Sequence, residues 1–294
     1  MALREIARTT WKSLLARPEP LLLPCAHDAL SARLIERAGF AAYSIGGFPL
    51  IGARYAIPDI GLAGFGEICA GVRDIVAASS LPVLIDADDG YGDVKNVTRT
   101  IRAYEDLGAS AVFIEDQRSP KRCGHMAGKE VIAAEAMALK VRAAAQARRN
   151  PDTFLIARTD ARAVFGLDEA LRRAERYLRA GADGVFVEAP QSEAELERIG
   201  RALHGVPLLA NMLEGGRTPL LAPAELHRLG FSMIAYPTTL IFRVARTIEK
   251  ALADLKSGAL TLAGQGVDFE QFKEITRFAE WATVEDAAQA QERS

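Results

Sequence analysis

Short apolar runs recur along the chain, and each run is followed by a segment with helical periodicity. The runs are almost continuously apolar, which is typical of strands that are buried on both faces of a parallel sheet. We predict strands over residues 21–25, 41–45, 82–85, 111–114, 154–157, 184–187, 207–210 and 233–235.

The segments between these runs predict amphipathic helices. From Leu167 onward, apolar residues recur on one face of a 3.6-residue period, and Ser192 with Glu195 has the pattern of a capping box. Eight strand-then-helix units in 294 residues predict an α/β fold, a (β/α)8 TIM-type barrel, rather than an open doubly wound sheet. No G-x-G-x-x-G follows the first predicted strand, which argues against a dinucleotide site.

The C-terminal part of the chain differs from the repeating units. We predict one barrel domain over residues 1–257 and a helical extension over residues 258–294. The extension carries apolar residues at helical spacing: Phe269, Phe272, Ile275, Phe278 and Trp281. This apolar surface is too large for a free tail, so we expect it to pack on the barrel or on a neighbouring subunit.

Composition excludes several classes of function. The chain is 49% hydrophobic and its net charge is −2, without a basic block, so nucleic acid is not an expected partner. The longest apolar runs have the length of strands and the N-terminus is polar, so neither a membrane span nor a signal peptide is expected. Three scattered cysteines, Cys25, Cys69 and Cys123, do not form a disulfide framework, so we expect a cytoplasmic protein.

Polar residues follow several predicted strands, where barrels carry their active sites. Asp86 and Asp88 follow the third strand, and Glu115 follows the fourth. Because residues i and i+2 share a face of a strand, we expect Asp86 and Asp88 to point together. Converging carboxylates repel one another unless a cation lies among them, and oxygen ligands favour Mg²⁺ or Mn²⁺. A single aspartate would more often cap a helix, but the three together favour a metal site.

Arg158 follows the fifth predicted strand. Inside an acidic mouth, its guanidinium suits a bidentate contact with a substrate carboxylate. Glu188 and Asn211 follow the sixth and seventh strands and are expected at the same mouth.

Two long loops, residues 46–64 and 118–133, interrupt the regular spacing, and such connections are usually functional. The second contains SPKRCGHMAGK. Cys123 and His125 offer only two zinc ligands, and the remaining histidines and cysteines do not complete a set. Lys121 and Arg122 would instead lower the pKa of the Cys123 thiol. The local sequence alone is compatible with a reactive Cys123 and with a Cys123 that has no role.

Five stretches resemble the isocitrate lyase/phosphoenolpyruvate mutase superfamily: DADDGYG at 86–92, EDQRSPKRCGH at 115–125, ARTDAR at 157–162, EAP at 188–190 and NMLEGG at 211–216. KRCGH with ARTDA resembles the carbon–carbon lyases of the family. The MAGK, EAP and NMLEGGRTPL sequences are most similar to the branch of 2,3-dimethylmalate lyase and the petal death protein, followed by 2-methylisocitrate lyase.

The resemblance implies a Mg²⁺-dependent lyase that splits a 2-alkylmalate-type acid into a 2-keto acid and a carboxylate by retro-Claisen cleavage. Cleavage of 2,3-dimethylmalate to pyruvate and propionate is one example. 2-Methylisocitrate lyase, oxaloacetate hydrolase or decarboxylase, and carboxyphosphonoenolpyruvate or phosphoenolpyruvate mutase-type P–C chemistry stay open as alternatives. The intact set of polar residues disfavours a silent barrel that acts as a binding protein.

The resemblance also implies a metal site. Asp86 and Asp88 match the metal-site aspartates, Glu115 matches a residue that holds metal-bound water, and Asp59 matches an acidic neighbour of the ion.

Substrate contacts are implied as well, for the backbone of Gly46 and Gly47 and for the side chains of Arg158, Glu188 and Asn211.

Cys123 matches the general acid that protonates the leaving half of the substrate, with Lys121, His125 and Glu115 as its catalytic neighbours. Residues 118–130 match the gating loop.

One expected group is displaced. Ser44 stands where related lyases carry the tyrosine that is often proposed as the base, and Tyr43, one residue earlier, should face away from the site. The general base is therefore unassigned. The resemblance further implies a homodimer or homotetramer with exchanged C-terminal helices, which would account for the apolar extension.

Overall fold

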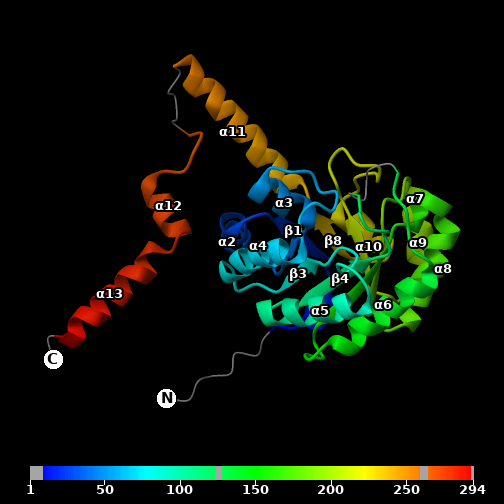
Figure 1. The fold of residues 1–294 in the computed structure, drawn as a ribbon. Helices are drawn as coiled ribbons and strands as arrows, with labels where there is room; N and C mark the ends of the chain where they lie inside the picture. The colour runs from blue at the N-terminus through cyan, green and yellow to red at the C-terminus, as the bar shows by residue number, and fades with distance from the viewer. Residues whose placement is uncertain (1–8, 123–127, 259–263, 293–294) are drawn as a thin grey trace. The chain divides into compact units, whose positions relative to one another are not determined.

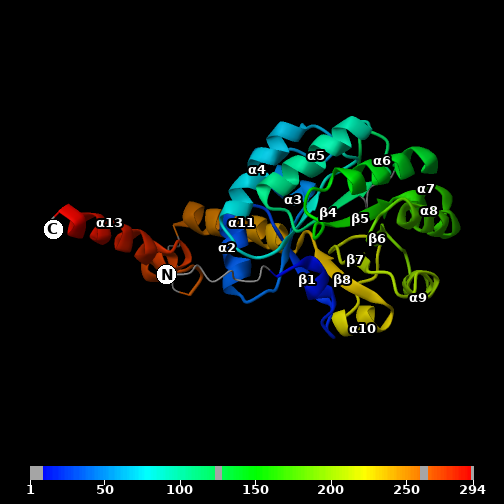
Figure 2. The same ribbon diagram turned by 90° about the horizontal axis from the view of Figure 1, so that it is seen from below.

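The computed structural model describes residues 9–122, 128–258 and 264–292. Eight parallel strands form a closed barrel in sequence order, and β8 pairs in parallel with β1 to complete it (Figures 1 and 2). The strands are β1 Leu21–Ala26, β2 Tyr43–Ile45, β3 Val83–Asp86, β4 Ala111–Glu115, β5 Phe154–Thr159, β6 Gly184–Val187, β7 Leu208–Asn211 and β8 Phe231–Tyr236.

Helices follow the strands and cover the outside of the barrel, as α4, α5, α6 and α8 do in Figure 2. The described helices of the barrel are α1 Trp11–Leu15, α2 Ala29–Arg37, α3 Gly47–Tyr55, α4 Phe65–Ala77, α5 Val94–Leu107, α6 Ala134–Ala147, α7 Ala161–Phe165, α8 Leu167–Arg179, α9 Glu193–Ala202 and α10 Pro223–Arg228. In α8, Leu167, Ala170, Leu171, Ala174 and Tyr177 are buried, which confirms the predicted helical face.

The barrel interior is filled by alternate residues of the strands, because successive side chains of a strand point to opposite faces. Its apolar core contains Leu23, Leu84, Phe113, Ile156 and Phe186. The intervening strand residues face outward and pack under the helices, as Ile85, Val112 and Leu155 do.

Helix α1 closes the amino end of the barrel. Thr10 caps the helix, since its hydroxyl accepts a hydrogen bond from the Ser13 amide at 3.2 Å. Trp11 and Leu14 are 0% and 1% exposed. They pack in the interior cluster with the first residues of several strands, including Leu21. The open end of the barrel is therefore the carboxyl end.

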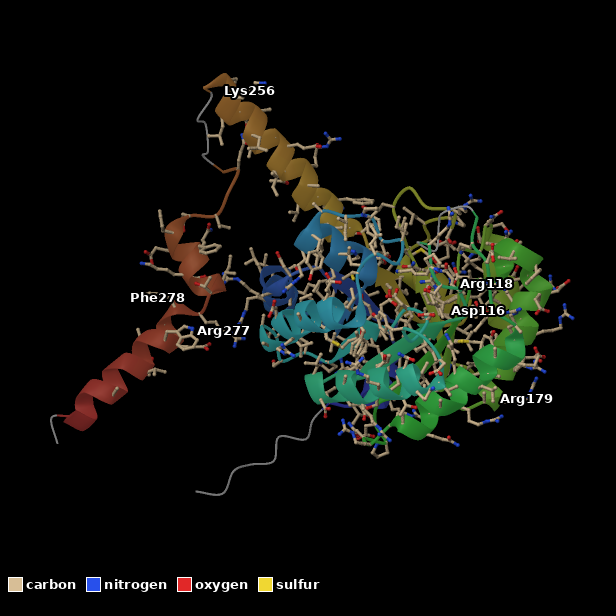
Figure 3. The ribbon with its side chains drawn as sticks, viewed as in Figure 1. Asp116, Arg118, Arg179, Lys256, Arg277 and Phe278 are labelled. Atoms are coloured by element: carbon tan, nitrogen blue, oxygen red, sulfur yellow. The ribbon has the colours of Figure 1, made fainter. Side chains whose placement is uncertain are left out.

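The chain divides into two compact units, Met1–Ile241 and Phe242–Ser294, and the division falls within α11 (Thr239–Ser257). The second unit continues with α12 (Phe269–Ile275) and α13 (Phe278–Glu292), and Arg277 between them has a left-handed φ of 56° (Figure 3). The predicted domain boundary at residue 257 stays a prediction.

The sequence predicted all eight strands within two residues of their observed ends, and the predicted barrel is confirmed. The observed strands extend further at the site: β3 includes Asp86, β4 includes Glu115 and β5 includes Arg158. These side chains therefore stand on strands rather than on loops. No described helix is both long enough and apolar enough to cross a membrane.

We expect Trp11→Ala to destabilise the barrel by about 3–5 kcal/mol, since it removes a fully buried indole and leaves a cavity. Urea unfolding followed by circular dichroism measures the change. Leu139→Ala, at a side chain that is 53% exposed on α6, is the control and should change stability by less than about 1 kcal/mol. Equal effects of the two substitutions would contradict the role of Trp11 in closing the barrel.

Candidate active site

A cavity opens at the carboxyl ends of the strands, and all eight strands contribute residues to its wall. Its empty volume, which includes space open to solvent, is about 680 Å³. It brings together most residues predicted for the site: Gly46, Gly47, Asp59, Asp86, Glu115, Lys121, Arg158, Glu188 and Asn211.

Lys121 joins two aspartates at one side of this cavity. Its Nζ lies 2.6 Å from Asp59 Oδ1 and 2.7 Å from Asp88 Oδ1. All three side chains are at least nine-tenths buried, and such pairs offset the desolvation of their charges only through close contact. The two ion pairs therefore connect the loops after β2, β3 and β4 at one point.

Asp88 reaches this point through an unusual backbone conformation. Strand β3 ends at Asp86, and Asp88 has a left-handed φ of 48°. The amide of Asp88 donates to Asp86 Oδ1 at 2.9 Å, and its carbonyl accepts from the Glu115 amide at 2.8 Å. Asp88 therefore lies beyond the strand, and the alternation of strand faces does not extend to it. Asp88 lines an adjacent cavity that also contains Lys121.

Burial raises the pKa of the carboxyl groups at this centre. Asp86 has its pKa raised to about 7, first by burial and then by the charge of Asp88. The pKa of Glu115 lies well above its ordinary value, because burial outweighs the attraction of Arg158. The pKa of Asp59 is also raised by burial, against the effect of Lys121. A neighbouring cation would favour the ionised forms.

These carboxylates fit a hard divalent ion held partly through water. Glu115 Oε1 is buried without a hydrogen-bond partner, and Glu115 lines the cavity together with Asp59 and Asp86. Within the described ranges, no three Asp, Glu, His or Cys side chains are arranged to ligate one ion. Mg²⁺ does not need such a set, because it keeps several waters and binds proteins through one or two carboxylates.

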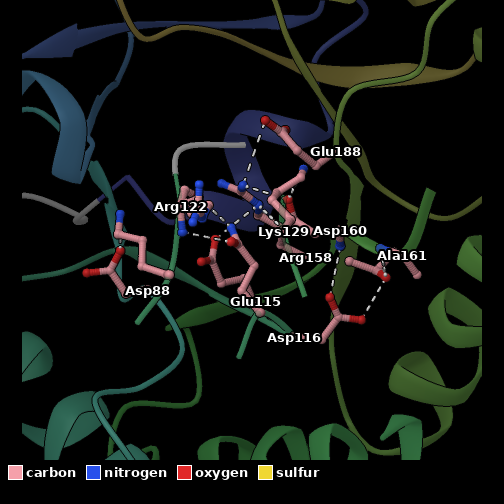
Figure 4. Close-up of polar contacts among 12 residues, drawn as sticks. Asp88, Glu115, Asp116, Arg122, Lys129, Arg158, Asp160, Ala161 and Glu188 are labelled. Carbon is pink, nitrogen blue, oxygen red and sulfur yellow. Dashed lines mark hydrogen bonds and ion pairs between the residues drawn. The ribbon is translucent and has the colours of Figure 1, made fainter. Parts of the chain in front are cut away.

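Arg158 lines the same cavity and lies among three carboxylates, as Figure 4 shows. Its Nε is 3.1 Å from Glu115 Oε2 and 2.9 Å from Asp160 Oδ2, and its Nη2 is 3.7 Å from Glu188 Oε1. The guanidinium also lies 5.2 Å from the centre of the Phe186 ring. The ion pairs at its nitrogens and the contact with the Phe186 ring thus hold the guanidinium in one direction.

A second layer of hydrogen bonds fixes the end of β5. Asp116, at the end of β4 (Figure 3), accepts from the Thr159 hydroxyl at 2.8 Å, the Asp160 amide at 2.9 Å and the Tyr177 hydroxyl at 2.8 Å. Arg173 is 3.0 Å from the same carboxylate. Asp116 therefore acts structurally and holds the segment that carries Arg158 and Asp160.

Comparison with known proteins identifies the family. The family model described as phosphoenolpyruvate phosphomutase matches residues 11–256. The chain is 41% identical over 266 residues to 2,3-dimethylmalate lyase of Eubacterium barkeri, covering 90% of this chain and 92% of that protein. It is 42% identical over 249 residues to probable 2-methylisocitrate lyase 1 of Corynebacterium glutamicum, covering 85% and 81%.

Solved structures agree. A crystal structure of 2,3-dimethylmalate lyase, described as a PEP mutase/isocitrate lyase superfamily member, matches with a TM-score of 0.88 and 31% identity over 94% of this chain and 93% of that one. The chain belongs to the PEP mutase/isocitrate lyase superfamily. Phosphonopyruvate hydrolase in complex with oxalate and Mg²⁺ also matches, with a TM-score of 0.84 and 27% identity over 94% and 96%.

The superfamily resemblance drawn from the sequence is therefore confirmed, as is its placement among carbon–carbon lyases. Tyr43 faces away from the site, as the alternation of strand residues predicts.

Tyr43 packs in the outer cluster under the helices, whereas Ser44 lines the cavity. Burial raises the pKa of Tyr43 far above its usual value, and its phenol does not reach the cavity.

Hydrogen bonds link the first and last described residues of the loop that follows β4. The Gln117 side chain donates to the Arg122 carbonyl at 2.9 Å and accepts from the Arg122 amide at 3.0 Å. Gln117 also bridges to Val131 in antiparallel fashion, and the Arg118 amide donates to the Glu130 carbonyl at 2.8 Å. Cys123 and His125, predicted for the site, lie outside the described residues.

Three residues that line the cavity, Cys25, Phe113 and Phe186, were not among the site residues predicted from the sequence. Cys25, at the end of β1, lines the wall, and burial raises the pKa of its thiol to about 12, so it is a neutral wall residue. Phe113 and Phe186 form an edge-to-face pair with ring centres 5.8 Å apart. The alternation of the strands contained the signal for all three, since each faces the interior. Asp160, which follows β5, forms an ion pair with Arg158, one of the two roles that an aspartate after a strand suggests.

We expect the free energy of unfolding of the metal-free protein to fall as the pH rises from about 4 to about 7. Folded Asp86 has a pKa of about 7, so between these values Asp86 binds more protons in the folded state than in the unfolded state and contributes stability that is lost as the pH rises. Asp86→Asn should remove a slope of up to about 1.4 kcal/mol per pH unit. Urea unfolding in EDTA at several pH values measures this slope.

The control is Asp93→Asn, because hydrogen bonds with Lys95 lower the pKa of Asp93 and it titrates below this range. An unchanged slope in Asp86→Asn would contradict the assignment to Asp86.

Proposed function

We propose that this protein is a Mg²⁺-dependent carbon–carbon lyase that cleaves a 2-alkylmalate-type acid into a 2-keto acid and a carboxylate. The observation that carries the proposal is one cavity at the strand ends that brings buried carboxylates together with Arg158. The similarity to 2,3-dimethylmalate lyase over nearly the full length of both chains supports the same reaction.

Four carboxylates are suited to the metal. Asp86 and Asp88 would hold Mg²⁺, with Mn²⁺ as a substitute, and Glu115 and Asp59 would contact its waters. The ion supplies electrostatic stabilisation of charge that develops on the substrate oxygens. The complex of a related hydrolase with oxalate and Mg²⁺ supports this choice of ion. Lys121 would leave its position between Asp59 and Asp88 or share it with the ion.

The dicarboxylate is bound by groups on the remaining strand ends. Arg158 offers a guanidinium of fixed direction to one carboxylate. Gly46, the N-cap of α3, and Gly47, its first residue, line the cavity, and the Gly47 amide, which donates to Asp86 Oδ2 at 3.3 Å, would serve another carboxylate. A Cβ at Gly47 would stand 3.3 Å from Lys121 Nζ, so a side chain there would crowd the site. Glu188 and Asn211 contact the hydroxyl end.

Cleavage breaks the C2–C3 bond of the substrate after the 2-hydroxyl gives its proton to a general base, and the hydroxyl oxygen becomes the carbonyl of the 2-keto acid. The electrons of that bond pass to the leaving half, which becomes an enediolate and needs a proton at carbon. We assign this proton to the thiol of Cys123 as general acid, supported by Lys121 and His125 in the same loop. Excluding water from the cavity would leave Cys123 as the proton source.

Part of the remaining wall is apolar and suits an alkyl substituent. Phe48, Phe113, Leu209, Leu213 and Pro237 line the cavity, beside Arg122. These apolar side chains support a substrate with an alkyl group, because a carboxylate placed against them would lack a partner. 2-Alkylmalates and 2-methylisocitrate both carry such a group.

We also propose a homodimer or homotetramer with exchanged C-terminal helices. Large apolar side chains in the second unit support it: Phe269, Phe278 and Trp281 are 87%, 57% and 72% exposed. The cytoplasmic location stays a prediction.

A substrate panel tests the function. We expect Mg²⁺-dependent release of a 2-keto acid from 2,3-dimethylmalate or another 2-alkylmalate, measured with a coupled dehydrogenase. 2-Methylisocitrate, isocitrate, oxaloacetate and phosphonopyruvate are run in parallel and distinguish the alternatives. EDTA should abolish turnover and added Mg²⁺ should restore it. Keto-acid release that persists in EDTA would exclude the metal role.

Cys123→Ser should lower kcat by about 10²–10⁴-fold, because a serine hydroxyl is a much weaker acid than a thiol. Binding of oxalate with Mg²⁺, measured by calorimetry, should be retained. Cys69→Ser is the control, since Cys69 packs with the helices outside the barrel. Full turnover by Cys123→Ser would remove Cys123 from the mechanism.

A further inference from the structure

A buried lysine outside the predicted site contacts the group that orients Arg158. Lys129 Nζ lies 2.5 Å from Asp160 Oδ1, and the two side chains are 1% and 0% exposed. Lysine is rarely buried to this extent unless it is paired. The contact joins residues 31 positions apart in the chain, and Figure 4 shows Lys129, Asp160 and Arg158 side by side.

Asp160 is shared between the two cations. Its Oδ1 accepts from Arg158 Nη2 at 3.1 Å as well as from Lys129, and its Oδ2 accepts from Arg158 Nε at 2.9 Å. The backbone amide of Asp160 is held by Asp116. Lys129 and Arg158 therefore meet on one carboxylate whose own position is fixed.

The local charge explains why a second cation is needed. Arg158 stands within 4 Å of the carboxylates of Glu115, Asp160 and Glu188. One guanidinium among three carboxylates would repel a substrate carboxylate. In a buried site such repulsion is screened less than in water. The ammonium of Lys129 compensates the charge of Asp160 and leaves more of the positive field of Arg158 for a ligand.

Lys129 is also anchored along the backbone. It precedes Glu130 and Val131, which pair with Arg118 and Gln117 in antiparallel fashion. The ammonium is therefore held by its chain as well as by Asp160.

We propose that Lys129 is a positioning residue for binding of the anionic substrate, acting through Asp160 on Arg158. The inference rests on the proposed function, because it takes Arg158 as the contact for a substrate carboxylate. Lys129 itself does not touch the ligand. It determines how strongly the site attracts a carboxylate, so its loss affects affinity more than the chemical step.

Calorimetric titration of the full-length protein with oxalate in excess Mg²⁺ tests this without turnover. Lys129→Met should raise the Kd of oxalate about 10–100-fold, the range expected for a lost charge-assisted interaction. With the substrate found in the panel, KM should rise similarly and kcat should change less than about threefold. Lys129→Gln, which keeps a donor but no charge, is measured alongside in case Lys129→Met does not fold.

A double substitution separates charge compensation from structural support. If Lys129 acts by compensating Asp160, its removal in an Asp160→Asn background should cost oxalate affinity less than about threefold, because no anion is left to compensate. An equal loss in both backgrounds would overturn the proposal. A wild-type Kd in Lys129→Met and Lys129→Gln would overturn it as well.

Arg148→Met is the matched control. Arg148 is ion-paired with Asp183 and is mostly buried, but neither residue lines the cavity. This substitution should lower thermal stability and leave the oxalate Kd unchanged. A wild-type protein that binds no oxalate with Mg²⁺ would overturn the proposed function and this inference with it. Wild-type binding that survives the loss of Lys129 would overturn the inference alone.

Discussion

The alternation of side chains along the parallel strands is the constraint on which the site depends. In each of several strands an interior apolar residue is followed two positions later by a polar one. Leu84 precedes Asp86, Phe113 precedes Glu115, Ile156 precedes Arg158, Phe186 precedes Glu188 and Leu209 precedes Asn211. The strand face that fills the barrel interior therefore also places the polar groups at its open end. The same alternation determines both the packing of the core and the position of the site residues.

The polar groups delivered in this way carry opposing costs of burial. Desolvation raises the pKa of Asp86, Glu115 and Asp59, which opposes ionisation. Lys121 lies within ion-pair distance of Asp59 and Asp88, and Arg158 lies within ion-pair distance of Glu115. These contacts offset part of the free energy needed to bury the carboxylate charges. A site balanced in this manner responds strongly to an added cation or anion, which is the property that a binding site for a metal and a carboxylate requires.

The sequence was sufficient to predict the barrel, because its eight apolar runs are strong local signals. It was also sufficient for Glu115 and Arg158, since strand ends converge in this fold. It was not sufficient for Asp88, whose left-handed φ breaks the alternation, nor for the contact between Lys129 and Asp160. A local turn conformation and a contact across 31 residues both depend on tertiary packing that no periodicity records.

The closure of the amino end by Trp11 and Leu14 has a consequence for product release. In the part of the chain that the structure describes, the barrel interior is filled below the cavity, so a ligand reaches the strand ends from the carboxyl side. A reaction that makes two molecules from one must then empty the cavity through the side by which it was filled. The packed interior, which Trp11 and Leu14 complete at its amino end, thus leaves one opening for the entry of the substrate and for the release of both products.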